Sequence, residues 1–383
     1  MYPYQDACPP CVWGADERAK LLRLPCAQRI AAGVRVAHSG VLHGVFACGG
    51  RLDKSVQAAL WLCLEGWGSK VYFRLMELAI VGLGRMGGRM ARRLVARGHR
   101  VVGYSRTKAT VDEHMPFGIM PAYTPEEVVH ALAPPRVVWF MYPAGEPTET
   151  AIFQFAPLLE AGDIVVNGAN SFYKDSIRYA ERLAVRGIRF ADVGVSGGVW
   201  GLESGYGLMV GGDPTVIAHI EPILRDLAPA PDKGWVHVGP VGAGHYAKMI
   251  HNGIEYALMQ AYAEGFELLR RKAEFQIDIA AVAEAWRYGT VIRSWLLDLI
   301  AGFLKEDSAL AEVAPYVADS GEGRWTAHEA IELGSPAPLI TLALHERFRS
   351  QDAEGFQYRF LAQLRNAFGG HAVKKVEENP SSR

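Results

Sequence analysis

Short apolar runs alternate with stretches in which apolar residues recur every three or four positions, and this alternation begins at Met76. The runs predict strands, and the stretches between them predict amphipathic helices. Strands that alternate with helices at this spacing predict a doubly wound α/β fold with a parallel sheet. The expected strands are 78–81, 100–104, 136–141, 163–167, 189–193, 207–211 and 235–238, and the expected helices include 86–97, 125–132, 149–159 and 174–186.

The pattern changes after Gly244, where strand signals stop and the sequence becomes rich in Ala and Leu. Two expected helices, 254–269 and 279–301, are apolar around much of their circumference, which indicates burial on several sides. We therefore predict an α/β domain over 76–243, followed by an all-α domain over 244–383 that takes part in homo-oligomer formation; the substrate-binding role of this second domain is implied by the resemblance described below.

Residues 1–75 show little periodicity apart from a short expected helix at 56–64. Because the buried strand at 78–81 is typical of the first element of a fold, we expect the folded protein to begin at Met76. One interpretation is that residues 1–75 are not native coding sequence and come from a wrong start-site choice. The other is a true extension of unassigned use.

All five cysteines lie in this extension, at positions 8, 11, 26, 48 and 63. Cys8-Pro-Pro-Cys11 has the CxxC spacing of a redox pair or of half a zinc site. A zinc site needs a second ligand pair, and a redox motif needs a strand before it and a helix after it. Neither context is present, so no metal site is predicted.

Composition narrows the functional classes. The formal net charge is −1, with 50% hydrophobic and 21% charged residues, which is ordinary for a soluble globular protein. That balance argues against nucleic acid or a membrane surface as a partner. No apolar run reaches the roughly 18 residues of a membrane span, and no secretory signal opens the chain. We expect a cytoplasmic protein.

The first expected strand leads into a GxGxxG motif that opens the next helix. Its glycines permit a tight turn, close approach of the backbone to a pyrophosphate, and close packing of helix on strand. The motif in this context predicts a Rossmann dinucleotide site, whereas a glycine-rich turn that serves only packing is the alternative. The expected contacts are Gly82, Leu83, Gly84, Arg85, Met86 and Gly87.

The end of the second strand favours NADP over NAD. NAD sites usually place an acid there for the ribose 2′-hydroxyl, but Ser105, Arg106 and Thr107 follow this strand and no acid occurs before Asp112. Arg106 can pair with a 2′-phosphate, or it can be an ordinary surface arginine. NAD therefore remains possible. Further cofactor contacts are expected from Tyr142, Pro143, Ala144 and Asn170.

One expected helix face carries the clearest chemistry. Lys248, His251, Asn252 and Glu255 stand at i, i+3, i+4 and i+7, so a base, an acid and two hydrogen-bonding groups share one stripe. A surface salt bridge is the usual explanation for Lys and Glu on one helix. On the pattern alone, a catalytic cluster and a surface stripe both remain open.

The segment Lys248-x-x-His251-Asn252-Gly-Ile-Glu255-Tyr256 resembles the signature of the 6-phosphogluconate dehydrogenases. The resemblance covers about 76–375 and is closest to the short bacterial branch. Four further segments resemble that family in order: Asn167-Gly-Ala-Asn170-Ser171, Val195-Ser196-Gly197-Gly198, Gly321-Glu-Gly-Arg324-Trp-Thr and Arg365-Asn-Ala-Phe-Gly-Gly-His371.

Three positions depart from the family pattern: Asn167 replaces an Asp, Ala169 a Gly, and Arg324 a Lys. The loop at Asn167 can therefore turn differently, and Arg324 gains bidentate contact with a phosphate.

The resemblance implies oxidative decarboxylation of 6-phosphogluconate to ribulose 5-phosphate and carbon dioxide without a metal. Lys248 would be the general base at the C3 hydroxyl, with a pKa brought toward neutral. Glu255 would be the general acid that protonates C1 of the enediol.

It also implies substrate contacts from two subunits. Asn170, Ser196, Gly197, Gly198, His251 and Asn252 would hold the sugar acid. Tyr256, Arg324 and Arg347 would bind the phosphate, with Arg365 and His371 reaching in from a neighbouring subunit. A homo-oligomer, dimer or tetramer, with shared active sites is therefore expected.

Two other functions are weighed against this one. A β-hydroxyacid dehydrogenase that does not decarboxylate would share the glycine loop and the Ser-Gly-Gly turn, but we would not expect the His-Asn-Gly-Ile-Glu-Tyr segment. A non-catalytic dinucleotide sensor would not need Lys248 and Glu255 on one helix face.

Overall fold

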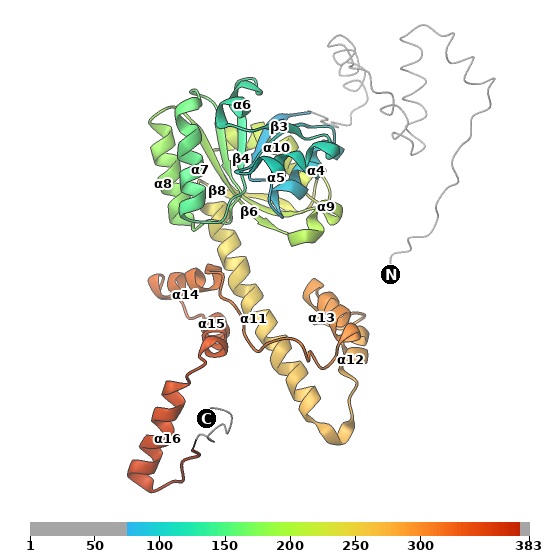
Figure 1. Cartoon of the computed structure of the whole chain (residues 1–383), viewed down its shortest axis with the longest axis vertical. Coiled ribbons are helices and arrows are strands. Elements are labelled where there is room, and N and C mark those ends of the chain that lie inside the picture. The colour runs from blue at the N-terminus through green and yellow to red at the C-terminus, as the bar shows by residue number, and fades with distance from the viewer. Residues whose placement is uncertain (1–74, 376–383) are drawn as a thin grey trace, which may run out of the picture. The chain divides into compact units, whose positions relative to one another are not determined.

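The computed structural model of the chain describes residues 75–375 (Figure 1). The expected helix at 56–64 and the Cys8–Cys11 motif lie outside the described residues. Within them, an eight-stranded sheet is followed by a series of helices.

The sheet has the strand order β3-β2-β1-β4-β5-β6-β7-β8 and confirms the expected doubly wound α/β fold. Neighbouring strands are parallel except for β6 and β7, which pair antiparallel. The strands are β1 Glu77–Val81, β2 Arg100–Tyr104, β3 Met120–Ala122, β4 Val137–Phe140, β5 Ile164–Asn167, β6 Arg189–Ser196, β7 Gly207–Gly212 and β8 Trp235–Gly239.

The orientation of β7 corrects the expectation of a wholly parallel sheet. Only a 3-10 turn, η3 (Gly198–Trp200), and one short helix, α9 (Gly201–Ser204), connect β6 to β7. A parallel crossover needs a dozen or more residues, so this short connection returns the chain in the opposite direction. β8 then pairs parallel to β7 after a full helical crossover.

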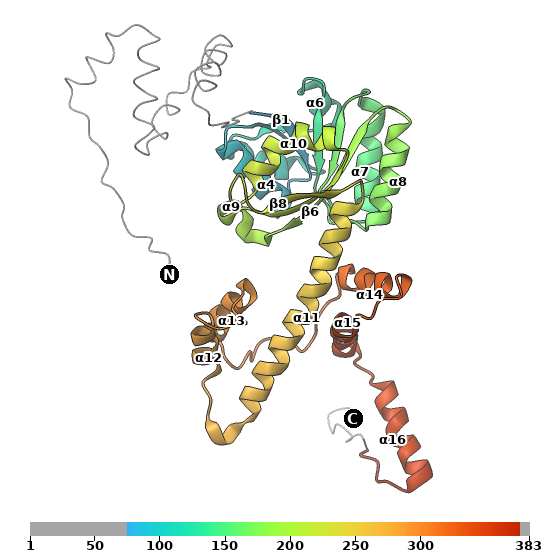
Figure 2. The ribbon, with the colours of Figure 1, turned by 180° about the vertical axis from the view of Figure 1, so that it is seen from behind.

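Helices cover both faces of the sheet (Figure 2). On one face, α4 and α10 pack on the β1 side chains Leu78 and Ile80; on the other, α6, α7 and α8 pack on Ala79 and Val81. The bounds are α4 Gly87–Ala96, α5 Lys108–Asp112, α6 Pro125–His130, α7 Glu146–Phe155, α8 Tyr173–Ala184 and α10 Pro214–Leu227, with 3-10 turns η1 Met115–Phe117 and η2 Ala156–Leu158.

Three local features differ from the sequence prediction. The edge strand β3 and the short helix α5 were not predicted; β3 has only three residues, one of them Pro121, and buries only Ala122, too little to form a pattern. An amphipathic helix exposes its charged side chains, but Arg93 of α4 is buried. It donates to carbonyls of α9 and of the α10 end, including Ala228 O at 2.7 Å.

The helices after the sheet are α11 Ala243–Arg271, α12 Ile279–Trp286, α13 Trp295–Glu306, α14 Glu322–Glu332, α15 Pro338–Gln351 and α16 Phe356–Gly369, with a 3-10 turn η4 at Ala273–Phe275. The single helix expected at 279–301 is wrong. Gly289 takes a left-handed φ of 74°, and Ser294 starts α13 by accepting a hydrogen bond from Leu297 N at 3.1 Å. A left-handed residue followed by an N-cap ends one helix and begins another.

The start of α11 is fixed tightly to the sheet. The buried carboxylate of Asp192 on β6 accepts hydrogen bonds from Gly242 N at 2.6 Å and His245 N at 2.7 Å. A Cβ on Gly194 would lie 2.3 Å from Cβ of Lys248, and one on Gly244 would lie 2.5 Å from Asp192 O. Because these glycines permit close contact, the first turns of α11 hold Lys248 against the end of β6.

Candidate functional site

The glycine-rich loop between β1 and α4 has the shape that a dinucleotide needs. Gly82 has φ +105°, and a Cβ there would lie 2.7 Å from Met141 O. A Cβ on Gly87 would lie 2.0 Å from Gly82 O, so this glycine permits helix and strand to pack. Gly84 is exposed with nothing within 4 Å of an added Cβ. The space over Gly84 fits a pyrophosphate at the helix N-terminus.

The other expected cofactor residues lie at the same edge of the sheet. Ser105, Arg106 and Thr107 directly follow β2, and Tyr142 follows β4 after Met141. Burial raises the pKa of Tyr142 to about 12; Tyr104 adds to this shift, and the nearby positive charge of Arg106 opposes it. The exposed Arg106 guanidinium therefore lies near the Tyr142 loop, which continues through the exposed Pro143 and Ala144. These residues thus follow the ends of β2 and β4, the two strands that flank β1 and its glycine loop.

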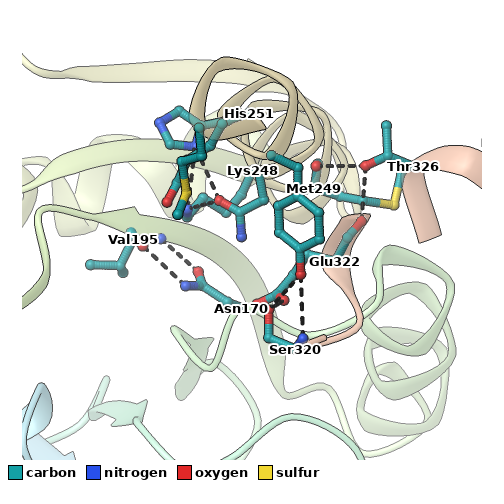
Figure 3. Close-up of polar contacts among 12 residues, drawn as sticks. Asn170, Val195, Lys248, Met249, His251, Ser320, Glu322 and Thr326 are labelled. Carbon is teal, nitrogen blue, oxygen red and sulfur yellow. Dashed lines mark hydrogen bonds and ion pairs between the residues drawn. The ribbon is translucent and has the colours of Figure 1, made fainter. Parts of the chain in front are cut away.

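The amine of Lys248 on α11 is buried, and polar side chains of the same helix lie beside it (Figure 3). Lys248 is only 5% exposed; its Nζ donates to Asn252 Oδ1 and lies 3.4 Å from His251 Nδ1. His251 Nδ1 in turn lies 3.8 Å from Glu255 Oε2. The helix stripe expected from the sequence therefore converges on one volume.

Burial lowers the pKa of Lys248 below its usual 10.5, and the carboxylates of Glu255 and Glu322 partly oppose this shift. A desolvated ammonium loses its proton more readily because the charged form is the one that water stabilises. Lys248 is thus prepared to act as a base nearer to neutral pH than an exposed lysine. Glu255 lies on the same face, where a carboxyl group can return a proton.

Asn170 links the end of β5 to the Ser-Gly-Gly turn. Its Nδ2 donates to Val195 O at 3.0 Å, and its Oδ1 accepts from Val195 N at 2.8 Å (Figure 3). Asn170 has a positive φ of 48°, so the loop turns sharply at this residue. Asn167, which stands where the family has Asp, donates to Ser171 Oγ at 3.1 Å and accepts from Ala169 N at 3.1 Å.

A hollow of about 510 Å³ lies beside this turn. Ser196 and Gly197 of the turn and His251 of α11 line it together, and Gly198 directly follows. Three of the expected sugar-acid ligands, Ser196, Gly197 and His251, thus line one hollow, whereas Asn170, Gly198 and Asn252 are not among its lining residues. Trp200 and Trp295 add aromatic walls that the sequence did not suggest.

A second cluster joins α11 to α14 and α15. The guanidinium of Arg347 stacks on the ring of Tyr256, with its Cζ 3.5 Å from the ring centroid. Arg324 and Tyr256 both bind Asp319, through Arg324 Nη2 to Oδ2 at 2.8 Å and Tyr256 OH to Oδ1 at 3.3 Å. The three expected phosphate ligands are therefore neighbours within one chain.

Arg365 and His371 are not buried with that cluster. Arg365 is exposed on α16, a helix without a buried residue among those the structure describes. His371 is also exposed, two residues beyond the helix, and its carbonyl accepts from Asn366 Nδ2 at 2.9 Å.

Sequence reasoning missed two residues of the turn before α14. Asp319 holds Arg324 and Tyr256, and Ser320 Oγ lies 3.0 Å from Tyr256 OH and donates to Glu322 Oε2. The signal was available, because Asp319 and Ser320 directly precede the Gly321-Glu-Gly-Arg324 segment. Within 75–375, no group of three or more His, Cys, Asp or Glu is placed to hold a metal, and no helix is long and apolar enough to cross a membrane.

Family comparisons cover almost the whole described part of the chain. Residues 77–294 match the NAD binding domain of 6-phosphogluconate dehydrogenase. Residues 244–379 match the 6-phosphogluconate dehydrogenase C-terminal domain.

Two curated relatives align over their full length. A Haloferax volcanii NAD(+)-dependent, decarboxylating 6-phosphogluconate dehydrogenase is 40% identical over 79% of this chain. The Bacillus subtilis protein YqeC, named as a candidate 6-phosphogluconate dehydrogenase, is 39% identical over 78% of this chain. A longer B. subtilis NAD(+)-dependent, decarboxylating enzyme is 36% identical, and the chain spans 61% of its length.

Among solved structures, the Plasmodium falciparum 6-phosphogluconate dehydrogenase, determined with NADP+ and with 6-phosphogluconate, matches with a TM-score of 0.67. It is 25% identical, and the match covers 80% of this chain and 67% of that one. A Salmonella typhimurium 3-hydroxyisobutyrate dehydrogenase matches at 21% identity with a TM-score of 0.61 over 73% of this chain and 95% of that one, which shows a shared fold.

Proposed function

Because the chain belongs to the 6-phosphogluconate dehydrogenase family, we propose that Lys248 and Glu255 carry out the acid–base steps of the oxidative decarboxylation of 6-phosphogluconate to ribulose 5-phosphate and carbon dioxide. The observation that carries the proposal is the buried amine of Lys248 on the same α11 face as His251, Asn252 and Glu255.

Lys248 acts first. Its neutral amine removes the proton from the C3 hydroxyl, a role that its lowered pKa supports. The nicotinamide dinucleotide, when bound over the glycine loop, supplies the hydride acceptor. The resulting 3-keto acid loses its carboxylate, and the protonated Lys248 stabilises the negative charge that develops on the enolate.

Glu255 then protonates C1 of the enediol. His251 and Asn252, which contact Lys248 or each other, hold the substrate hydroxyls, together with Asn170 and the Ser196–Gly198 turn. Asn252 also accepts from Lys248 Nζ, which helps to hold the amine in place for the C3 hydroxyl. No metal ligand is needed in these steps.

The phosphate of the substrate binds the cluster of Tyr256, Arg324 and Arg347. Arg365 and His371 complete it from a second copy of the chain, which is why both are exposed in one copy. This makes the active enzyme an oligomer with shared sites. We propose that the reaction takes place in the cytoplasm.

NADP is the proposed cofactor. The chain has no acid at the end of β2, and Arg106 is exposed there with Ser105 and Thr107 beside it. The relatives from H. volcanii and B. subtilis carry NAD(+) in their names, so cofactor choice is tested separately from the reaction.

The test is a steady-state assay with 6-phosphogluconate and NADP or NAD side by side. We expect one carbon dioxide and one ribulose 5-phosphate for each reduced cofactor, with higher kcat/KM for NADP. Reduced cofactor without carbon dioxide would contradict the reaction. A preference for NAD would contradict only the cofactor assignment. 3-Hydroxyisobutyrate serves as the control substrate and should give little turnover.

A further inference from the structure

Asp319 lies at the centre of the proposed phosphate cluster, although the sequence patterns did not point to it. Its Oδ2 accepts two hydrogen bonds from Arg324, from Nε at 3.0 Å and Nη2 at 2.8 Å. Its Oδ1 accepts from Tyr256 OH at 3.3 Å and from Gly321 N at 3.0 Å. One carboxylate therefore contacts two proposed phosphate ligands and the N-cap residue of α14.

The surroundings of Asp319 make it a rigid anchor. Its side chain is 5% exposed, whereas that of Arg324 is 53% exposed. Burial alone would raise the pKa of Asp319, but the Gly321 amide and the Arg324 guanidinium outweigh it and hold that pKa below its usual value. The carboxylate is thus charged and fixed, while Arg324 without it would be a long, mobile surface side chain.

Two of the five N–H donors of the guanidinium are engaged by Asp319, which leaves the others for an incoming anion. Fixing one edge of an arginine in this way orients the free edge before the ligand arrives. Pre-organisation of this kind raises affinity because less side-chain freedom is lost on binding.

We propose that Asp319 is a positioning residue for the phosphate subsite, which acts by orienting Arg324 toward the phosphate of the substrate. This rests on the proposed function, because it takes Arg324 as a phosphate ligand. Asp319 is not assigned contact with the substrate.

Two effects of Asp319 on a phosphate oppose each other. Its negative charge repels a dianion, but that charge is already paired with Arg324 at 2.8 Å. The orienting effect involves charge-assisted hydrogen bonds, which are stronger than neutral ones. Orientation should therefore outweigh repulsion, and loss of the carboxylate should weaken substrate binding.

The test variant is Asp319→Asn, whose amide oxygen can still accept from Gly321 N and Tyr256 OH, while its NH₂ cannot accept from Arg324. We expect KM for 6-phosphogluconate to rise by about ten-fold, the scale of losing a hydrogen bond to a charged group. KM for the cofactor should stay within about two-fold, because only the anchor of one subsite is altered. An unchanged or lower KM for 6-phosphogluconate would overturn the proposal.

Glu267→Gln is the matched control. Like Asp319, Glu267 is a carboxylate that pairs with arginine: it accepts hydrogen bonds from Arg270 Nε at 2.8 Å and from Arg271. It lies near the C-terminal end of α11, away from Asp319 in the sequence. Exposed pairs of this kind contribute little, so both KM values should stay within about two-fold of wild type. If Asp319→Asn does not yield folded protein, Asp319→Ser is measured against the same criterion.

A double-mutant cycle with Arg324→Ala separates the positioning role of Asp319 from the phosphate-binding role of Arg324. If Asp319 acts through Arg324, Asp319→Asn should change KM by less than about two-fold in the Arg324→Ala background. A full additional loss there would overturn the positioning role. If Arg324→Ala alone leaves KM unchanged, the phosphate assignment in the proposed function fails. If it raises KM and Asp319→Asn does not, only the positioning role fails.

Discussion

The sheet region and the helices after it bury their apolar side chains to different degrees. Every residue of β4 and β5 is buried, and clusters on both sheet faces are completed by residues of the same chain. By contrast, α16 has no buried residue among those described, and Phe356 and Leu361 on it are 65% and 53% exposed. Such exposure is expected of a helix that packs against another copy of the chain, as we propose for α16. The core of the sheet region is buried within one copy, whereas α16 buries none of its described residues.

The largest expected effect comes from Lys248, which stands where α11 leaves the sheet. Lys248→Met keeps much of the side-chain volume and removes the base. We expect kcat to fall by at least about 100-fold, the usual effect of losing a general base, with cofactor binding unchanged. Stopped-flow turnover and cofactor titration measure both. Activity within a few-fold of wild type would show that Lys248 is not the base.

The second-largest expected effect concerns the difference in burial between the sheet region and α16. A Phe356→Asp and Leu361→Asp double variant adds charge to the exposed apolar surface of α16. We expect sedimentation to show smaller particles and KM for 6-phosphogluconate to rise about ten-fold or more, because burying an unpaired charge opposes association.

Val185→Asp is the control in the sheet region, since Val185 is 89% exposed just after α8. It should alter neither the sedimentation nor the KM. Equal effects of the two changes, or none from the α16 pair, would remove the distinction between the regions.

A smaller effect concerns pH. The base form of Lys248 is the active one, and burial lowers its pKa below 10.5. The logarithm of kcat/KM should therefore rise with pH and level off below pH 10.5. A pH–rate profile measures this. A rate that still rises toward pH 10.5 would mean that the amine is not desolvated in the working enzyme.

The smallest expected effect is on stability. Between the lowered pKa of folded Lys248 and 10.5, the unfolded chain binds more protons, so the free energy of unfolding rises with pH. Below that window the cost of the buried charge is fully present. Lys248→Met should therefore raise the free energy of unfolding at pH 7 by on the order of 1 kcal/mol, as apolar replacement of buried charge often does.

Denaturant titrations at pH 7 and pH 10 check this result. The difference between variant and wild type should shrink at the higher pH. A variant less stable than wild type at pH 7 would contradict the sign.

Much of the sheet region could be predicted because local patterns decide it. The apolar runs of β1, β4 and β5 are buried on both faces, and the glycines between β1 and α4 stand where backbone atoms meet. The direction of β7 could not be predicted from its own residues, since the length of its connection decides it. The break at Gly289 was hidden by apolar residues on both sides.

Only those parts of the candidate site that lie on one helix could be predicted from local patterns. Lys248, His251 and Asn252 lie on one helix, so their spacing already places them together. Asp319 lies in an irregular turn and meets Tyr256 only through the tertiary packing of α14 on α11, where a Cβ on Gly323 would lie 2.3 Å from the Tyr256 ring. No periodic pattern in the sequence indicates such a tertiary contact.

The central claim is that Lys248 of one copy works with Arg365 of another. Mixing Lys248→Met and Arg365→Ala subunits under conditions of exchange tests this directly, at a 6-phosphogluconate concentration where neither variant alone is active. In a hybrid dimer, one site carries both changes and the other carries neither. Random pairing in a symmetric dimer should then restore about a quarter of wild-type activity. No recovery, with exchange verified, would contradict the shared site.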